Sequence, residues 1–190
     1  RQFRSVLEVL AASIDAKDSM TAGHSSRVAE YTVGIASELG FNEDDIDTLN
    51  VAALLHDYGK LGTDDSILKK PGRLTPDEFE HIKEHVVNTR NILNKMTFSR
   101  KYKAVPILAS RHHERLDGSG YSEGLTATEI PFMSRIIAVA DVFEALTAQR
   151  HYRGPLSVEE AFAILDQDVG TKFDGNVVRA LKAFYKRNHA

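Results

Sequence analysis

The chain contains 190 residues, of which 42% are hydrophobic, so it is long enough for one domain with a well-filled core. Its 24 basic and 27 acidic side chains give a formal charge of -3, which excludes the strongly basic surface of a sequence-independent nucleic-acid binder, so we expect no DNA partner. The absence of cysteine excludes disulfides, thiolate nucleophiles and zinc-thiolate sites, and it leaves histidine, aspartate and glutamate as the strong metal ligands.

The composition also bears on where the protein acts. No run of apolar residues approaches the roughly 20 needed to cross a bilayer, and the N-terminus lacks the basic and then apolar order of a signal peptide. Together with the absence of cysteine, this favours a protein of the reducing cytoplasm that does not insert into membranes. The chain begins with Arg1 rather than with an initiator methionine, from which we expect that a regulatory domain precedes it.

The first segment predicts an amphipathic helix. Apolar residues recur there at three- and four-residue steps, which is a helical spacing. They are Phe3, Val6, Leu7, Leu10 and Ile14. We interpret 1–17 as a connecting helix, through which a dimer could form, and 18–190 as the main domain.

The next elements are also predicted as helices. One ends at Gly40, which is well placed for a left-handed cap, and the following one runs toward His56. The sequence Thr-Pro-Asp-Glu at 75–78 is typical of a capping box with proline at the first helical position. The helix that it starts carries His85.

The last third of the chain continues the pattern. A helical stretch leads to the histidine pair at 112–113, and 117–131 predict a glycine-rich loop that a proline closes. The apolar spacing of 132–147 is again helical, and a serine and a glutamate at 157–160 start a further capped helix. No segment shows sustained period-two alternation, so we predict an all-α fold.

Five of the eight histidines point to metal binding. A lone histidine is more often a core or surface residue than a ligand, but these five lie at helix ends or on helix faces beside turns, and two of them sit next to Asp57 or near Asp141. Imidazole and carboxylate ligands suit iron, manganese, nickel or zinc better than magnesium or calcium. The five are His24, His56, His85, His112 and His113.

The adjacent pair His56 and Asp57 indicates a dinuclear centre. An imidazole binds one ion, whereas a neighbouring carboxylate has two oxygens and can bridge two ions. Two metals roughly 3.5–4 Å apart can hold a shared water as hydroxide and stabilise both the attacking and leaving oxygens of a phosphoryl displacement, which fits phosphodiester hydrolysis. Lys60 lies one helical turn after His56 if the helix continues, and it could neutralise phosphate oxygens or, equally well, be a surface lysine.

At these positions the sequence resembles an HD-GYP domain, the cyclic di-GMP phosphodiesterase branch of the HD superfamily. The resemblance covers roughly 18–178. It rests on His-Asp-Tyr-Gly-Lys at 56–60, His-His-Glu-Arg at 112–115, Asp-Gly-Ser-Gly-Tyr at 117–121 and the stretch 130–141. It implies an all-α bundle of the HD-superfamily type with an iron- or manganese-type centre. The implied reaction hydrolyses cyclic di-GMP to linear pGpG, and in some members on to GMP.

The resemblance also implies roles for single residues. The first metal would be held by His24, His56, Asp57 and Asp141, and Asp57 would bridge to a second metal held by His85, His112 and His113. Asp57 and Lys60 would serve catalysis. Substrate would be bound by Lys60, Tyr121, Arg150 and Arg153, since arginine suits bidentate recognition of phosphate or guanine.

Two departures from the family pattern affect these expectations. Met20 replaces a glutamate that would hold a third metal, so we expect two ions. Ser122 replaces the proline after Gly120 and Tyr121, which removes a fixed φ and loosens the loop.

The role of Glu114, which follows the histidine pair at 112–113, stays open from the sequence. It could orient the neighbouring histidines or face solvent.

Two alternatives to a cyclic di-GMP phosphodiesterase stay open from the sequence. In one, the protein is a low-turnover receptor or interaction module whose loop Gly120-Tyr121-Ser122 contacts a partner such as a diguanylate cyclase. In the other, it remains a hydrolase but acts on another substrate, such as cyclic GMP-AMP or a nucleotide of the wider HD superfamily.

Overall fold

The computed structural model describes residues 2–18, 22–149 and 154–189. The helices, including two short 3-10 segments, are α1 (Gln2–Lys17), α2 (His24–Glu38), α3 (Glu43–Leu54), η1 (Tyr58–Gly62), α4 (Asp65–Leu68), α5 (Pro76–Leu93), η2 (Arg100–Tyr102), α6 (Val105–Ser110), α7 (Phe132–Thr147), α8 (Val158–Gln167) and α9 (Gly175–His189). Within those ranges there is no β-strand, so the predicted all-α class is confirmed. None of the described helices is both long and apolar enough to cross a bilayer.

Local sequence accounts for where several helices begin and end. Both predicted capping boxes form, at Thr75 with Glu78 and at Ser157 with Glu160. Each box satisfies backbone N–H groups that the first helical turn leaves without a partner. After α2, Gly40 has a φ of 76°, a left-handed conformation that glycine adopts without a steric penalty. The expected helix over 132–147 corresponds to α7.

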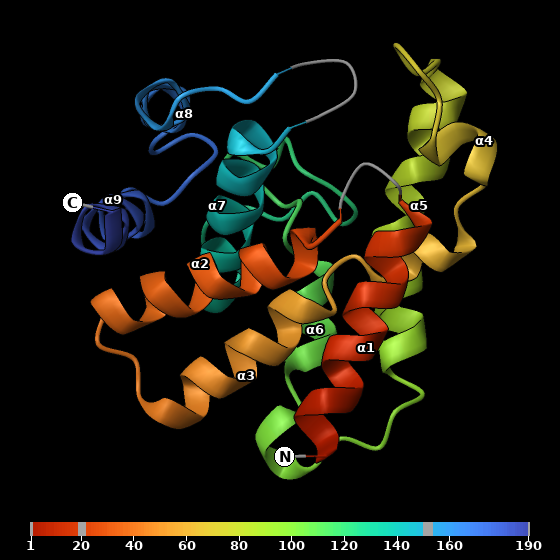
Figure 1. Ribbon diagram of the computed structural model, residues 1–190, viewed down its shortest axis with the longest axis horizontal. Coiled ribbons are helices and arrows are strands. Elements are labelled where there is room, and N and C mark those ends of the chain that lie inside the picture. Colours follow the sequence, from red (N-terminus) through yellow and green to blue (C-terminus); the bar gives the residue numbers. More distant parts are fainter. Residues whose placement is uncertain (1, 19–21, 150–153, 190) are drawn as a thin grey trace.

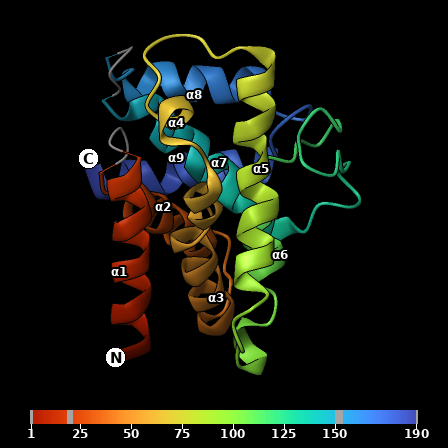
Figure 2. The same ribbon diagram turned by 90° about the vertical axis from the view of Figure 1, so that its right-hand side faces the viewer.

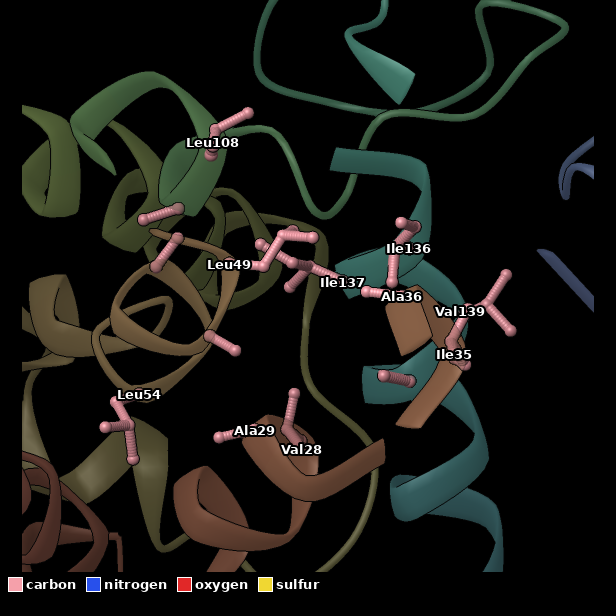
Figure 3. Packing of buried hydrophobic residues seen from close by; sticks show 14 of the residues in the cluster. Val28, Ala29, Ile35, Ala36, Leu49, Leu54, Leu108, Ile136, Ile137 and Val139 are labelled. Carbon is pink, nitrogen blue, oxygen red and sulfur yellow. The ribbon is translucent and has the colours of Figure 1, made fainter. Parts of the chain in front are cut away.

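Helix α2 organises the bundle, because it contacts α1, α3, α7 and α9. In Figure 1, α2 and α7 cross near the centre of the molecule, with α8 and α9 on one side and α1, α5 and α6 on the other. Figure 3 shows side chains of α2, α3, α6 and α7 turned toward a common interior, where Ile35, Leu49 and Ile137 are fully buried. This core places the inner ends of several helices close together.

Helix α1 packs on this core along one face only. Leu7, Ala11 and Ile14 are buried, and the Asp15 carboxylate accepts hydrogen bonds from the backbone N–H and the hydroxyl of Ser25 at 3.0 and 2.7 Å. Figure 2 shows α1 upright at the edge of the molecule, and the segment between α6 and α7 projecting from the opposite side. The division of the chain at 17/18 stays a prediction.

A close approach at Gly59 joins the turn after α3 to α5. A Cβ at this position would lie 1.9 Å from the carbonyl oxygen of His85 and 2.3 Å from the backbone nitrogen of Thr89. The Gly59 N–H donates to the Thr89 hydroxyl at 2.8 Å, and that hydroxyl donates to the carbonyl of His56 at 3.2 Å. Glycine therefore lets η1 lie directly on α5 and brings His56 and Asp57 beside His85.

Candidate metal centre

The side chains that the sequence predicts as metal ligands come together inside the bundle in two groups. Within each group the ligand atoms all lie within 4.8 Å of one another. One group is His24, His56 and Asp141, and the other is Asp57, His85, His112 and His113. His24 begins α2, His85 lies on α5 and Asp141 lies on α7, whereas the remaining ligands lie in turns directly after α3 and α6.

Asp57 lies between the two groups and turns a different oxygen toward each. Its Oδ1 lies 3.3 Å from Nε2 of His85 and 3.5 Å from Nε2 of His112. Its Oδ2 lies 3.6 Å from Nε2 of both His24 and His56. Burial alone would raise the pKa of this carboxyl, but the charges of His56 and Lys60 hold it well below its usual range. Asp57 is therefore an anion whose two oxygens face two sets of imidazoles.

The histidines are held so that Nε2 faces the centre. In three of them Nδ1 lies against the carbonyl oxygen three residues earlier, at 2.6 Å for His56, 2.6 Å for His85 and 2.7 Å for His112. A carbonyl only accepts, so Nδ1 must carry the proton in the neutral ring, which leaves the lone pair on Nε2. This tautomer is the one that a metal ion needs when it binds through Nε2.

Two of these inward nitrogens lack a hydrogen-bond partner. Among the buried side-chain polar atoms of the described residues, only Thr32 Oγ1, His85 Nε2 and His112 Nε2 are unsatisfied. Leaving such atoms unpaired is costly, and ligation by a cation would satisfy both nitrogens. Burial also lowers the pKa of His112 and, more strongly, that of His113, so both rings stay neutral and able to bind metal. The donor set fits divalent ions, although its role as a ligand set stays a prediction.

Lys60 lies at this centre although the helix before it does not continue. Helix α3 ends at Leu54, and Lys60 lies in η1, so the premise of a continuous helix was wrong. Its Nζ still lies 2.7 Å from Asp57 Oδ2, and it lies 3.2 Å from Asp18 Oδ2. Burial opposes the charge of Lys60, but these two carboxylates raise its pKa above the ordinary value. Lys60 is therefore a permanently charged donor beside the predicted bridge.

Tyr121 reaches the same centre from the glycine-rich loop. Its ring stacks on that of His113, with centroids 4.7 Å apart and planes inclined by 19°, and its N–H donates to the His113 carbonyl at 3.2 Å. A Cβ at Gly120 would lie 2.3 Å from that carbonyl, so only glycine allows the approach.

Glu114 has neither of the two roles considered from the sequence. Its buried carboxylate accepts hydrogen bonds from the N–H groups of Glu123 and Leu125 at 2.7 and 2.8 Å, so it holds the loop rather than the histidines. In the sequence, Glu114 directly follows His112 and His113, and this position suggested that it orients them. The backbone turn of the loop instead presents two N–H groups to this carboxylate.

A residue that the sequence analysis did not assign to the site is Glu144. Its carboxylate is buried, contacts Nδ1 of His24, and pairs with the Arg27 guanidinium at 2.7 Å. Glu144 lies three residues after Asp141 on α7, and this spacing places both carboxylates on one helix face. That spacing was the available signal in the sequence.

Some predicted residues fall outside the part of the chain that the structure describes. These are the substrate-binding Arg150 and Arg153, and also Met20, on which the expectation of two rather than three ions depends.

Comparisons with known proteins identify the family of the chain. A family model described as "HD domain" matches residues 8–177. The chain is 44% identical over 169 residues to "3'3'-cGAMP-specific phosphodiesterase 3" of Vibrio cholerae, covering 89% of this chain and 36% of that protein. It is 41% identical over 175 residues to the "Cyclic di-GMP phosphodiesterase" of Thermotoga maritima, covering 92% of this chain and 47% of that protein.

The fold matches as well. A solved HDG"Y"P protein from Bdellovibrio bacteriovorus superposes with a TM-score of 0.68 at 20% identity, over 86% of this chain and 51% of that one. The chain spans less than half the length of the two curated relatives, at 36% and 47%.

Proposed function

This chain belongs to the HD domain family, as its motifs predicted, and we propose that it is a metal-dependent phosphodiesterase that hydrolyses a guanine-containing cyclic dinucleotide. Cyclic di-GMP is the first candidate substrate, with linear pGpG as the product. The observation that carries the proposal is Asp57, whose two oxygens face two separate groups of inward-directed imidazoles. A carboxylate in this position can bridge two ions, as the proposed two-ion centre needs.

The proposed ligands divide between two ions. His24, His56 and Asp141 would hold one, His85, His112 and His113 would hold the other, and Asp57 would be shared. Imidazole and carboxylate ligands suit iron, manganese, nickel or zinc, and the resemblance to HD-GYP domains makes iron or manganese the first candidates. When bound, the ions supply Lewis acidity toward the phosphoryl oxygens and lower the pKa of water.

The chain's own side chains would position the substrate. Lys60 keeps its proton, so it acts as a donor to non-bridging phosphate oxygens rather than as a base. Its present partners, Asp57 and Asp18, hold its Nζ at the edge of the ligand cluster. Tyr121 stacks on His113 and would contact the ligand beside the second ion. Arg150 and Arg153 would grip a phosphate or a guanine.

A second candidate substrate is 3'3'-cyclic GMP-AMP. The similarity to the Vibrio cholerae enzyme named for that substrate supports it, and the similarity to the Thermotoga maritima enzyme supports cyclic di-GMP to a comparable degree. The complete ligand set argues against a receptor without turnover. Contact of the 120–122 loop with a diguanylate cyclase, and a dimer, stay predictions from the sequence.

The proposal is tested by turnover of metal-loaded protein. The protein is purified without oxygen and loaded with Fe²⁺ or Mn²⁺. It is then incubated with cyclic di-GMP and, in a separate reaction, with cyclic GMP-AMP, and the products are separated. We expect a linear dinucleotide, and we expect Asp57→Asn to lower kcat by at least about 100-fold, because the shared anionic ligand is lost.

The matched control is Asp166→Asn, which removes an exposed carboxylate on α8 that pairs with Lys182. This variant should turn over like the native chain. Tight binding of either dinucleotide without product would instead favour the receptor. Metal analysis should find about two ions per chain, and a third bound ion would contradict the expectation drawn from Met20.

A further inference from the structure

Beside the candidate metal centre, Tyr121 forms a surface together with two side chains, Phe79 and Lys83, that none of the assigned roles uses. Phe79 on α5 is 46% exposed and meets Tyr121 edge-on, with centroids 6.3 Å apart and planes at 79°. The Nζ of Lys83, one helical turn later, lies 5.0 Å from the Phe79 centroid and 5.6 Å from the Tyr121 centroid. We name Phe79, Lys83 and Tyr121 the aromatic shelf.

The shelf is continuous with the ligand cluster. Tyr121 stacks on His113, and the His113 ring lies 5.1 Å from that of His85. A row of rings therefore leads from the candidate second metal through His113 and Tyr121 to Phe79, which is partly exposed. A substrate whose phosphodiester lies at the ligand cluster would carry its nearest base toward this row.

A second group of one phenylalanine, one tyrosine and one lysine shows that these three residue types do not by themselves define a binding site. Phe3 is 42% exposed, its centroid lies 5.4 Å from that of Tyr102, and Lys101 lies 5.5 Å from the Tyr102 centroid. This trio is at the opposite end of α1 from Asp18, which contacts Lys60, and so about 20 Å away along the helix axis. What distinguishes the aromatic shelf is its connection to the ligand cluster.

The chemistry of the shelf suits one class of ligand. Every nucleobase has a flat face that stacks on an aromatic side chain. Lys83 pairs with Glu80 at 2.5 Å, and its ammonium has two further N–H groups, which match the O6 and N7 acceptors of guanine. Adenine presents an amino group in place of O6, and an amino group cannot accept from lysine.

We propose that the aromatic shelf binds one guanine base of the substrate, with Phe79 as the stacking surface and Lys83 as the donor that selects guanine over adenine. This inference rests on the proposed function, because the phosphodiester must lie at the ligand cluster for a base to reach the shelf. It gives Phe79 and Lys83 a role in specificity rather than in the chemical step.

The test combines steady-state kinetics with a stacking probe. The metal-loaded chain is assayed with cyclic di-GMP and with cyclic di-AMP. In parallel, it is mixed rapidly with a cyclic dinucleotide in which 2-aminopurine replaces both guanines, so that the base on the shelf is always the probe, and fluorescence is read before turnover. Stacking on an aromatic ring quenches this probe.

We expect Phe79→Leu to raise KM for cyclic di-GMP about tenfold and to abolish the quenching, whereas Phe79→Tyr should retain both native values. Lys83→Met keeps the aliphatic stem and removes the donor, so it should reduce the preference for cyclic di-GMP over cyclic di-AMP about tenfold. Phe3→Leu is the matched control, because it changes the same residue type in the second trio, and it should leave KM and quenching at native values.

The outcomes separate this inference from the proposed function. Suppose that the native chain quenches the probe, that Phe79→Leu abolishes the quenching, and that the native chain forms no linear product. This result would support the shelf and refute the proposed function. Turnover by the native chain with KM and quenching unchanged in Phe79→Leu would overturn the shelf. A native chain that does not quench the probe would overturn it too, whether or not product forms.

Discussion

Single atoms decide how the candidate centre is arranged. The Nδ1 atoms of His56, His85 and His112 face carbonyls of their own chain segments, whereas Nδ1 of His24 faces the carboxylate of Glu144. A carboxylate partner raises the basicity of a ligating imidazole more than a carbonyl does, because it stabilises positive charge on the ring. His24 is thus the one of these four histidines whose ligand strength depends on an anion.

Replacing that anion gives a prediction about metal affinity. Glu144→Gln keeps the size of the side chain but removes the charge beside His24, so we expect metal affinity to fall about 10- to 100-fold, as is typical for partners of ligating histidines. Competition with a chromogenic chelator measures this. Glu144→Asp keeps a carboxylate and should recover part of the affinity.

The control for Glu144 is Glu159→Gln, which changes an exposed glutamate on α8. This variant should bind metal like the native chain. If Glu144→Gln binds metal with native affinity, the contact of Glu144 with His24 does not strengthen metal binding. The carboxylate would then serve only to hold Arg27.

At the scale of elements, turns carry more of the site than helices do. His56 and Asp57 follow α3, and His112 and His113 follow α6, so four of the predicted ligands lie where a helix has just ended. A turn can direct adjacent side chains to one point, whereas neighbours on a helix diverge by roughly 100°. The position of such a turn then depends on what it packs against, and here η1 packs against α5 through Gly59.

This contact predicts how much stability the fold loses when a single methyl group is added at Gly59. In Gly59→Ala the Cβ would meet the backbone of His85 and Thr89, which cannot move without shifting α5. We expect the free energy of unfolding to fall by about 1–3 kcal/mol, the usual cost of overpacking. Urea denaturation measures the change.

Gly62→Ala is the matched control for Gly59→Ala, because it lies in the same 3-10 segment. Its Cβ would meet only the side chain of Asn88, at 2.9 Å from Nδ2, and that side chain can rotate away. We expect a change of less than about 0.5 kcal/mol, as for most surface substitutions. Equal losses in the two variants would show that the contact of η1 with α5 is not specific.

At the scale of the whole molecule, the ligand cluster links parts of the chain that are remote in sequence. His24 and Glu144 are 120 residues apart, and the two ligand groups draw on the ends or faces of α2, α3, α5, α6 and α7. Two bound ions would therefore hold five helices together at one point. Any ligand that binds the folded chain alone stabilises it by mass action.

Metal loading should accordingly stabilise the fold. With free Mn²⁺ at 100 times its dissociation constant, we expect the free energy of unfolding to rise by about 2.7 kcal/mol per site, and a chelator should reverse the rise. Thermal unfolding with and without Mn²⁺ measures it. Mg²⁺ prefers oxygen ligands and should give a smaller effect. Identical shifts with the two ions would argue against ligation by the histidines.

The sequence by itself determined the helical class, the capping boxes at 75–78 and 157–160, the extent of α7 and the identity of the candidate ligands. These features depend on local spacing, on side chains bonding to backbone groups within three residues, and on short motifs, so they can be read along the chain. The structure brings these side chains into two groups, and their role as ligands stays a prediction.

Only the tertiary structure decided which atoms face each other. The split of the Asp57 oxygens, the pairing of Lys60 with Asp18, and the contact of His24 with Glu144 join residues from different elements. Such contacts depend on how helices cross and on how closely a turn such as that at Gly59 can approach its neighbour. Periodicity along a chain specifies which face of a helix is buried, but not which side chain of another helix it meets.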